Sequence, residues 1–419
     1  MTMNRRDFMQ LAGLAGLSLL VPQTLRRGFA APLTDAAPHL WVFVHAGGGW
    51  DQTLLCDPKG RKNAEDTAPV DNYDAATIAS YGNLKCAPVP AVQAFFAKRY
   101  NDLLVVNGID TQTNSHDAGT RFAWSGHLSE GWPCLAALIA AQTGADKSLA
   151  FVSYGGYDAT AGVAPLTRLG SPQTFASLAA PDQLDPTKPA RFQTEATSAR
   201  IEAAQQARLL AMQKRPGAPR ALDNAAALYA LHASDSDLGK LVKALPTTLA
   251  SDPLQKQAQL ILAGFASGLS VAANMTRGGF DTHGNHDATH IPAMENLIVG
   301  VDFLLDQAAA MGLADRLTVV VGSDFGRTPS YNAGKGKDHW SVASNLLIGK
   351  GISGNRVVGS TTEALKAVNL DAKSLAPSDS GVHLTHGAVH RSLRALAGID
   401  GTELAARFPI SEPLLPILG

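Results

Sequence analysis

The sequence predicts an α/β protein with a mainly parallel sheet flanked by helices, and three observations support this class. The helical spacing of residues 89–100 is followed by the apolar run 103–106 (LLVV), the helix-then-strand order of a parallel sheet. The run 317–321 (LTVVV) is apolar on both faces, as a central parallel strand is. Polar clusters follow these runs, and open α/β sheets bind their ligands beyond the carboxyl ends of the strands.

The elements of the first half follow in order from their apolar patterns. The run 39–44 (HLWVFV) predicts a first buried strand that leads into a glycine-rich loop. A helix is expected over residues 132–144 and a strand over 149–153. Residues 165–250 change character, first rich in proline and polar residues and then rich in alanine, which predicts a helical insertion. Its helices are expected over residues 195–212 and 221–244.

The second half continues the alternation of helices and strands. A helix over residues 252–268, a strand over 269–273 and a turn at 277–283 precede a helix over 291–311. Short strands are expected at 345–348 and 356–358, and a final helix at 386–397. His383, His386 and His390 would share one face of a helix there; one of them could replace His339 as a metal ligand, but a capped, solvent-facing helix is the expected setting.

Length and composition exclude several classes of protein. The chain has 419 residues, of which 45% are hydrophobic and 17% charged, so a disordered chain is excluded. With 35 Lys and Arg against 36 Asp and Glu, the formal net charge is −1, and no nucleic-acid partner is indicated. Cys56, Cys86 and Cys134 have neither metal-binding spacing nor the number that a disulfide framework needs.

The amino terminus has the features of an export signal. Arg5 and Arg6 precede an uncharged stretch at residues 11–22, and Ala30-Ala31 offers small residues for cleavage. The paired arginines resemble a twin-arginine signal, so residues 1–31 are expected to be a signal peptide read by the twin-arginine export machinery. The mature domain, residues 32–419, would be periplasmic or secreted, with no membrane span, because the uncharged stretch is too short to cross a bilayer.

Four loops collect the side chains that bind metal ions. They are residues 45–51, 115–117, 281–287, and 323–324 together with 337–339. Carboxylate oxygens and imidazole nitrogens together hold Zn²⁺, Mn²⁺ or Mg²⁺, so two or three of these loops would form a metal site if they converge. The alternative for each loop is a polar turn or a helix cap, and the sequence leaves both open.

Two further residues have a functional and a structural interpretation. Ser115 could be a nucleophile at the amino end of a helix, or only the cap of that helix. Arg327 could bind an anionic substrate through its guanidinium group, or play a structural part. The sequence contains no GxSxG, P-loop, GxGxxG or HExxH motif, which argues against serine hydrolases, nucleotide-binding proteins and zincins.

Three segments carry a resemblance to a known family. They are residues 279–283 (GFDTH), 324–329 (DFGRTP) and 336–340 (GKDHW). In this order they resemble the exported family called domain of unknown function 1501, within the alkaline-phosphatase and sulfatase superfamily. The resemblance implies an alkaline-phosphatase-like core and an exported, metal-dependent hydrolase of phosphate or sulfate esters. It also implies a small anionic ester as substrate and a divalent metal cofactor, Zn, Mn, Mg or Ca.

The resemblance also assigns roles to individual residues. It places Asp281, with His283 or His286, and His339 around one ion. It places Asp51 and Asp324 around a second ion and makes Ser115 the nucleophile.

The sequence departs from the superfamily at one position of the site. Phe325 stands where active phosphatases and sulfatases have a histidine directly after the aspartate, which removes an expected ligand of the second ion. The alternative function is therefore a catalytically silent, metal-stabilised exported binding protein of the same fold.

Overall fold

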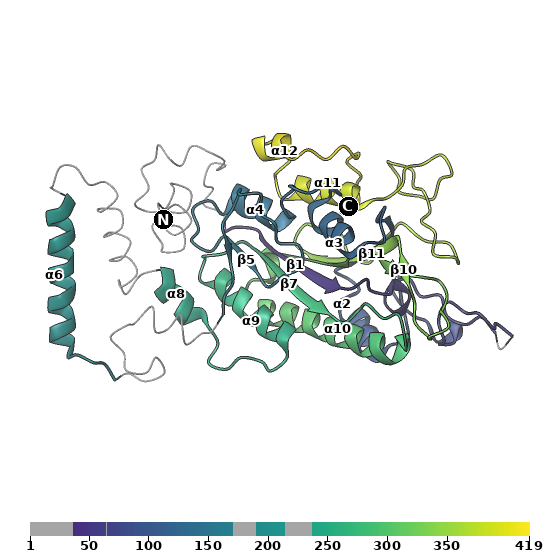
Figure 1. The fold of residues 1–419 in the computed structure, drawn as a ribbon, viewed down its shortest axis with the longest axis horizontal. Coiled ribbons are helices and arrows are strands. Elements are labelled where there is room, and N and C mark those ends of the chain that lie inside the picture. Colours follow the sequence, from purple (N-terminus) through teal and green to yellow (C-terminus); the bar gives the residue numbers. More distant parts are fainter. Residues whose placement is uncertain (1–36, 64, 171–189, 214–236) are drawn as a thin grey trace.

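The computed structural model describes residues 37–63, 65–170, 190–213 and 237–419, and its centre is an eight-stranded sheet (Figure 1). The order of the strands is β12-β4-β11-β8-β1-β7-β5-β6. β11 pairs antiparallel with both β4 and β8, while the other strand pairs of this sheet are parallel. The predicted α/β class with a mainly parallel sheet is confirmed. In chain order the strands are β1 (Leu40–Gly47), β4 (Leu103–Asp110), β5 (Phe151–Ser153), β6 (Leu166–Thr167), β7 (Ala272–Gly278), β8 (Leu317–Ser323), β11 (Val342–Gly349) and β12 (Arg356–Val358).

Helices cover both faces of the sheet, as Figure 1 shows. The helices on one face are α2 (Pro90–Arg99), α9 (Pro253–Ala266) and α10 (His286–Ala310). The helices on the other face are α3 (His116–Ser125), α4 (Leu135–Thr143) and α11 (His386–Leu396). Strand β1 shows why two layers form, because its side chains alternate between the faces: Val42 packs into the first core and Phe43 into the second. Apolar residues on both faces are what the run 39–44 predicted.

Smaller elements complete the described chain. The strand pairs β2 (Ala79–Tyr81) with β3 (Leu84–Cys86) and β9 (Gly326–Arg327) with β10 (His339–Trp340) are antiparallel. Short helices are η3 (Gln52–Leu54), η4 (Ala75–Thr77), η5 (Ala314–Arg316) and α12 (Glu403–Arg407). Of the expected insertion, α6 (Glu195–Gln213) and α8 (Asp237–Ala244) are described, and α6 stands apart from the sheet in Figure 1. Residues 171–189 and 214–236 of the insertion, and the expected signal peptide, lie outside the described residues.

Two element boundaries differ from the sequence-based expectation where the site is built. The strand expected at 269–273 is β7, which runs to Gly278 and includes residues expected in a turn. The helix expected from residue 291 begins five residues earlier, at His286. Asn285 starts it in a left-handed conformation (φ 47°), and the carbonyls of Gly334 and Lys335 accept the N–H groups of Asn285 and His286. This outside support replaces the capping side chain that would have marked the start in the sequence.

Two other observations bear on the environment of the chain. Cys56, Cys86 and Cys134 are all free and buried, and burial raises the pKa of each thiol. Within the described ranges, no helix has the length and apolar character needed to cross a membrane.

Candidate metal centre

The topology gathers the four predicted loops at one edge of the sheet. β1, β4, β7 and β8 are parallel, so the segments after them leave from the same edge. β11 is antiparallel, so its beginning lies at that edge too, and His339 comes three residues before it. The reversal of a single strand therefore brings His339 to the loops of the other strands.

Three side chains from three of these segments form a group that could hold a metal ion. His116 begins α3, Asp281 follows β7, and His339 precedes β11; one ligand atom from each lies within 4.8 Å of the others. His283 joins them, because its Nε2 is 3.0 Å from Asp281 Oδ1 and 3.0 Å from His339 Nε2. His339 Nε2 is itself 3.2 Å from the same carboxylate oxygen. We call His116, Asp281, His283 and His339 the metal-site group.

Each imidazole of the metal-site group is held by its other ring nitrogen. The Nδ1–H of His116 donates to Asp324 Oδ2 (2.6 Å), and that of His339 to the carbonyl of Asn114 (2.8 Å). The Nδ1–H of His283 donates to Asp338 Oδ1 (2.7 Å). A neutral imidazole that donates from Nδ1 has a lone pair on Nε2. This arrangement, in which a carboxylate or carbonyl fixes the tautomer, is typical of histidines that bind metals through Nε2.

The lone pairs of these rings converge on a position that a cation could occupy. Nε2 of His116 is buried and has no hydrogen-bond partner among the described residues, although Asp281 Oδ2 lies 3.5 Å away. The two Nε2 atoms of His283 and His339 face each other at 3.0 Å, which is repulsive between lone pairs. A cation among these nitrogens and the Asp281 carboxylate satisfies all of them, and this donor set of imidazole and carboxylate suits Zn²⁺ or Mn²⁺.

Asp281 is ionised and remains accessible. Partial burial raises the pKa of its carboxyl, but the hydrogen bond and positive charge of the Arg327 guanidinium lower it further, to a net value of about 2. Its side chain is 49% exposed, so a small molecule in solution can reach the group. Arg327 is completely buried behind it and donates to Asp281 Oδ1 (2.8 Å) and to the carbonyls of Gly48, Gly49 and Lys337. These contacts make Arg327 a positioning residue; its expected contact with a substrate stays a prediction.

Asp324 supports the metal-site group and is fully occupied by hydrogen-bond donors. Besides His116, it receives the N–H of Gly48 and lies 3.2 Å from Nε2 of His45. Trp124 Nε1–H donates to His45 Nδ1 (2.8 Å), so the proton of the neutral His45 ring is on Nε2 and points to Asp324. Burial lowers the pKa of His45, which keeps this ring neutral. Asp324 therefore orients His116 from behind.

Asp51 and His286 belong to a separate buried group, in a ring of hydrogen bonds. The N–H of Asp51 donates to His290 Nε2 (2.8 Å), so the proton of this ring is on Nδ1 and points to Thr282 Oγ1 (2.9 Å). Burial lowers the pKa of His290 well below its ordinary value, consistent with a neutral ring. The Thr282 hydroxyl then donates to His286 Nδ1 (2.7 Å), and His286 Nε2–H to Asp51 Oδ2 (3.0 Å). Both nitrogens of His286 are used, which leaves no lone pair for a metal.

The second partner of Asp51 is an ammonium group. Lys337 Nζ lies 2.6 Å from Asp51 Oδ2, 2.7 Å from Asp71 Oδ1 and 3.3 Å from Thr53 Oγ1, and all four side chains are buried. Burial raises the pKa of Asp51, but Lys337 and His286 lower it further, so the carboxyl is ionised. We call Asp51, Asp71, Thr53 and Lys337 the lysine cage.

The structure therefore groups the expected site residues differently from the way the family resemblance implied. Asp281, His283 and His339 lie together, while Asp51 lies with His286 and Asp324 lies with His116. Ser115 is exposed and stands at the amino end of α3, without a side-chain capping bond, directly before His116. Sequence reasoning placed His116 and Lys337 in the predicted loops 115–117 and 337–339, but gave His116 no role as a ligand and Lys337 no role as a partner of Asp51. The available signal was position, because His116 directly follows Ser115 and Lys337 lies two residues before His339.

The residues present fit one metal ion and do not fit a second. The metal-site group offers converging lone pairs, whereas Asp51 and Asp324 already have cationic or N–H partners. Phe325 stands in place of the expected histidine and is completely buried. The centroid of its ring lies 4.8 Å from that of the His116 ring and 4.4 Å from that of the His339 ring.

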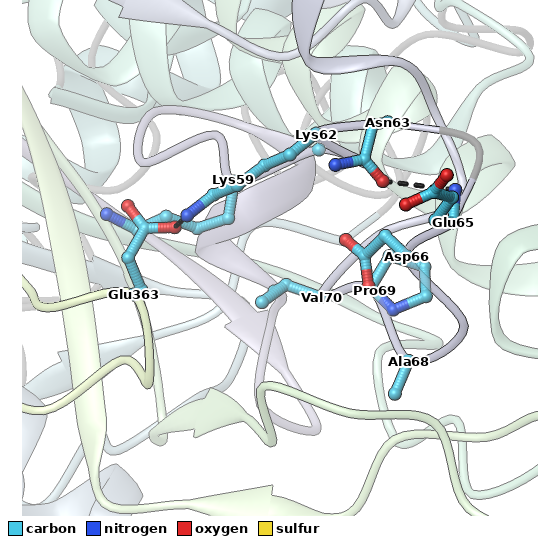
Figure 2. Close-up of a pocket in the computed structure, with 10 residues that line it drawn as sticks. Lys59, Lys62, Asn63, Glu65, Asp66, Ala68, Pro69, Val70 and Glu363 are labelled. Atoms are coloured by element: carbon cyan, nitrogen blue, oxygen red, sulfur yellow. Dashed lines mark hydrogen bonds and ion pairs between the residues drawn. The ribbon is translucent and has the colours of Figure 1, made fainter.

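Two cavities of the described chain lie away from the metal-site group. One, of about 490 Å³, is lined by residues 59, 60, 62, 63, 65, 66 and 68–70 and by Glu363, and its lining residues are drawn in Figure 2. Lys62 and Glu363 form an ion pair at its wall (2.8 Å), so these two charges neutralise each other. The second, of about 550 Å³, is lined by Asn285, His286 and Tyr331 among others and borders the buried group. Neither is lined by His116, Asp281 or His339.

Comparisons with known proteins give a family and several distant structures. A family model described as "Protein of unknown function (DUF1501)" matches residues 39–407. No curated protein matches the sequence. Similar solved structures include Ps i-CgsB in complex with k-i-k-neocarrahexaose, at 8% identity and TM-score 0.41, covering 90% of this chain and 75% of that one.

Two further structures are comparably distant. The PsFucS1 sulfatase from Pseudoalteromonas sp. is 12% identical, with TM-score 0.30 and coverage of 87% and 70%. A mutant of TAB5 alkaline phosphatase with bound Mg is 10% identical, with TM-score 0.32 and coverage of 77% and 95%.

Proposed function

The chain belongs to the DUF1501 family, and we propose that it is an exported hydrolase of phosphate or sulfate esters that depends on one divalent metal ion. The ion would be held by His116, Asp281 and His339, with His283 beside them. The observation that supports this proposal is the convergence of these side chains, whose Nε2 lone pairs face one carboxylate and have their Nδ1–H groups fixed elsewhere.

The arrangement has the parts that ester hydrolysis needs. A bound divalent ion would polarise an oxygen of the phosphoryl or sulfuryl group and stabilise its negative charge. Ser115 is exposed beside His116, and the free N–H groups at the start of α3 favour an anion there, which supports Ser115 as the proposed nucleophile. Arg327 holds Asp281 in position, and Asp324 holds His116. A small anionic ester is the proposed substrate because the metal-site group is open to solvent.

The proposal predicts that Asp281→Asn removes the metal and the activity together. The substitution takes away the only charged ligand of the metal-site group and leaves the fold, because the side chain is half exposed. Elemental mass spectrometry of protein purified without chelator should find about one ion per chain in the wild type and none in the variant. Hydrolysis of an aryl phosphate and an aryl sulfate, measured on the same samples, should disappear in Asp281→Asn and in Ser115→Ala.

A control variant outside the site tests whether these losses are specific to Asp281. Asp379→Asn changes an exposed carboxylate outside the site and should keep both ion and turnover. Turnover that persists in Asp281→Asn without metal would refute a metal-dependent hydrolase.

A second candidate is a catalytically silent binding protein that keeps the ion for stability. Phe325 and the lysine cage favour it, because they remove the second metal ion that the superfamily resemblance implies for hydrolysis. It is distinguished by chelation: the unfolding temperature would fall by mass action while no ester is turned over.

Export is part of the proposal, and the evidence for it comes from the sequence alone. Arg5, Arg6 and the following uncharged stretch support recognition by the twin-arginine machinery and a periplasmic or secreted location.

A further inference from the structure

Two carboxylates that the resemblance places on one second ion have different partners in the structure. Asp324 accepts N–H groups from His116 and Gly48 and contacts His45. Asp51 contacts the Lys337 ammonium and the His286 ring. A divalent ion at Asp51 would have to displace an ammonium group that is covalently part of the chain.

The lysine cage has the chemistry of a cation site with its cation in place. An ammonium group has three N–H donors, and Lys337 has three oxygen partners, from Asp51, Asp71 and Thr53. Two carboxylates and a hydroxyl are also the oxygen ligands that bind hard divalent ions. The Tyr331 ring lies 5.1 Å from Nζ and closes the cage on a further side.

We propose that Lys337 is a built-in cation that takes, at Asp51, the place of a second metal ion, so that the protein binds one exchangeable ion and not two. The part of the proposal that concerns the one exchangeable ion rests on the proposed function. The part that concerns Lys337 rests on the lysine cage alone. The contacts of Lys337 Nζ with Asp51 Oδ2 (2.6 Å) and Asp71 Oδ1 (2.7 Å) are those of an ammonium group between two carboxylates.

The fixed charge has a mechanical consequence for the metal-site group. The backbone N–H of Lys337 donates to the Thr282 carbonyl (3.1 Å), and its carbonyl accepts from Arg327 (3.0 Å). His339, two residues later, is a proposed ligand. Lys337 therefore fixes the segment before His339 to the Asp51 loop by charge, without depending on a supply of metal.

The test is to remove the ammonium and count ions. Lys337→Met keeps the apolar stem and leaves Asp51 and Asp71 as an acidic cage. After incubation with Zn²⁺, Mn²⁺, Mg²⁺ or Ca²⁺ separately, then desalting, the wild type should hold one ion per chain and Lys337→Met two with at least one of these metals. The unfolding temperature of Lys337→Met should fall in chelator and recover with that metal. Lys335→Met, at an exposed lysine of the same segment, is the matched control and should behave as wild type.

Asp51→Asn tests the same idea in the opposite direction. It should leave the wild-type count at one, because Asp51 is not a ligand. A wild-type count of two that falls to one in Asp51→Asn would overturn the proposal. So would a folded Lys337→Met that stays at one ion with each of the four metals and is insensitive to chelator.

Two further variants keep the test decisive. If Lys337→Met does not fold, the double variant Asp51→Asn/Lys337→Met removes both charges of the closest pair; a folded double variant with one ion supports the proposal, and one with two ions overturns it. Asp281→Asn should lose the first ion, and Asp281→Asn/Lys337→Met should hold one, at the cage. A wild type without any ion would refute the proposed function, while a gain of one ion in Lys337→Met would still support the built-in cation.

Discussion

Asp324 shows at the scale of one residue how a carboxylate can serve a metal centre without binding the ion. Its oxygens accept from His116 Nδ1 and from the N–H of Gly48, and His45 Nε2 lies 3.2 Å away. Trp124 fixes the proton of His45, so the direction of each of these hydrogen bonds is determined. The negative charge of Asp324 thus orients the His116 ring and makes its Nε2 a stronger ligand.

This role predicts that Asp324→Asn weakens the metal site without abolishing it. The amide turns an N–H₂ group toward donors that need an acceptor, so His116 should lose its fixed orientation. Outer-shell changes of this kind typically cost about 10–100-fold in metal affinity. Competition with a chelator of known affinity measures the change, and circular dichroism checks the fold. If Asp324→Asn loses metal binding as completely as Asp281→Asn does, Asp324 is itself a ligand. If the metal affinity is unchanged, Asp324 has no positioning role.

At the scale of elements, α3 carries His116 and has to lie unusually close to the loop after β8. Gly119 permits this approach: a Cβ atom there would come within 2.6 Å of the Asp324 carbonyl oxygen and 3.1 Å of the Phe325 ring. Such a contact with backbone forces either the helix or the loop to move. The glycine therefore sets the distance between His116 and the carboxylate that orients it.

Gly119→Ala should for this reason destabilise the protein and weaken metal binding together, although Gly119 is no ligand. Alanine in place of glycine normally stabilises a helix interior by up to about 1 kcal/mol. Overpacking a buried contact typically costs about 1–3 kcal/mol, so the net effect should be a loss of stability. Urea unfolding and chelator competition measure the two effects. Thr120→Ala on the same helix is the control. If Gly119→Ala raises the stability instead, α3 is not held in close contact with the loop after β8.

The same elements show which parts of the fold and site the sequence could predict. β8 and β4 were predictable because they are buried on both faces and read as continuous apolar runs. The start of α10 was not, because the carbonyls that receive its first N–H groups belong to residues 334–335, some 50 positions later in the sequence.

The site was predictable as a set of loops but not as a set of partners. Loops at strand ends follow from a parallel sheet, so the grouping of Asp281, His283 and His339 could be expected. That Lys337 would neutralise Asp51 depends on contacts across 286 positions, which no local pattern records.

At the scale of the whole molecule, buried neutral imidazoles make stability depend on pH. Burial lowers the pKa of His45 and His290 below the ordinary value of 6.5, and that of His386 and His390 to about 3. Contrary to the expectation of a solvent-facing helix, His386 and His390 are buried on α11. Below pH 6.5 the unfolded chain binds protons that the folded chain does not bind until about pH 3. The free energy of unfolding should therefore fall as the pH falls through this range.

His386 offers the clearest test, because neither of its ring nitrogens has a hydrogen-bond partner within the described chain and its ring packs edge-on against Phe122, at 5.5 Å between centroids. A pKa of 6.5 in the unfolded chain and about 3 in the folded chain makes the loss on going from pH 7.5 to pH 5 about 2 kcal/mol for this residue. His386→Leu removes the titrating group and an unsatisfied polar ring, so it should be at least as stable as the wild type at pH 7.5. It should also lose about 2 kcal/mol less than the wild type at pH 5.

Urea unfolding of metal-free protein at the two pH values measures this difference, since removing the ion excludes acid release of metal as a cause. Carboxyl groups that titrate in the same range contribute equally to both proteins and cancel in the comparison. His383→Gln, at an exposed position just before α11, is the control and should keep the wild-type acid sensitivity. If His386→Leu loses as much stability at pH 5 as the wild type does, the ring of His386 is already protonated or hydrated in the folded chain, and the acid sensitivity has to come from the other buried histidines.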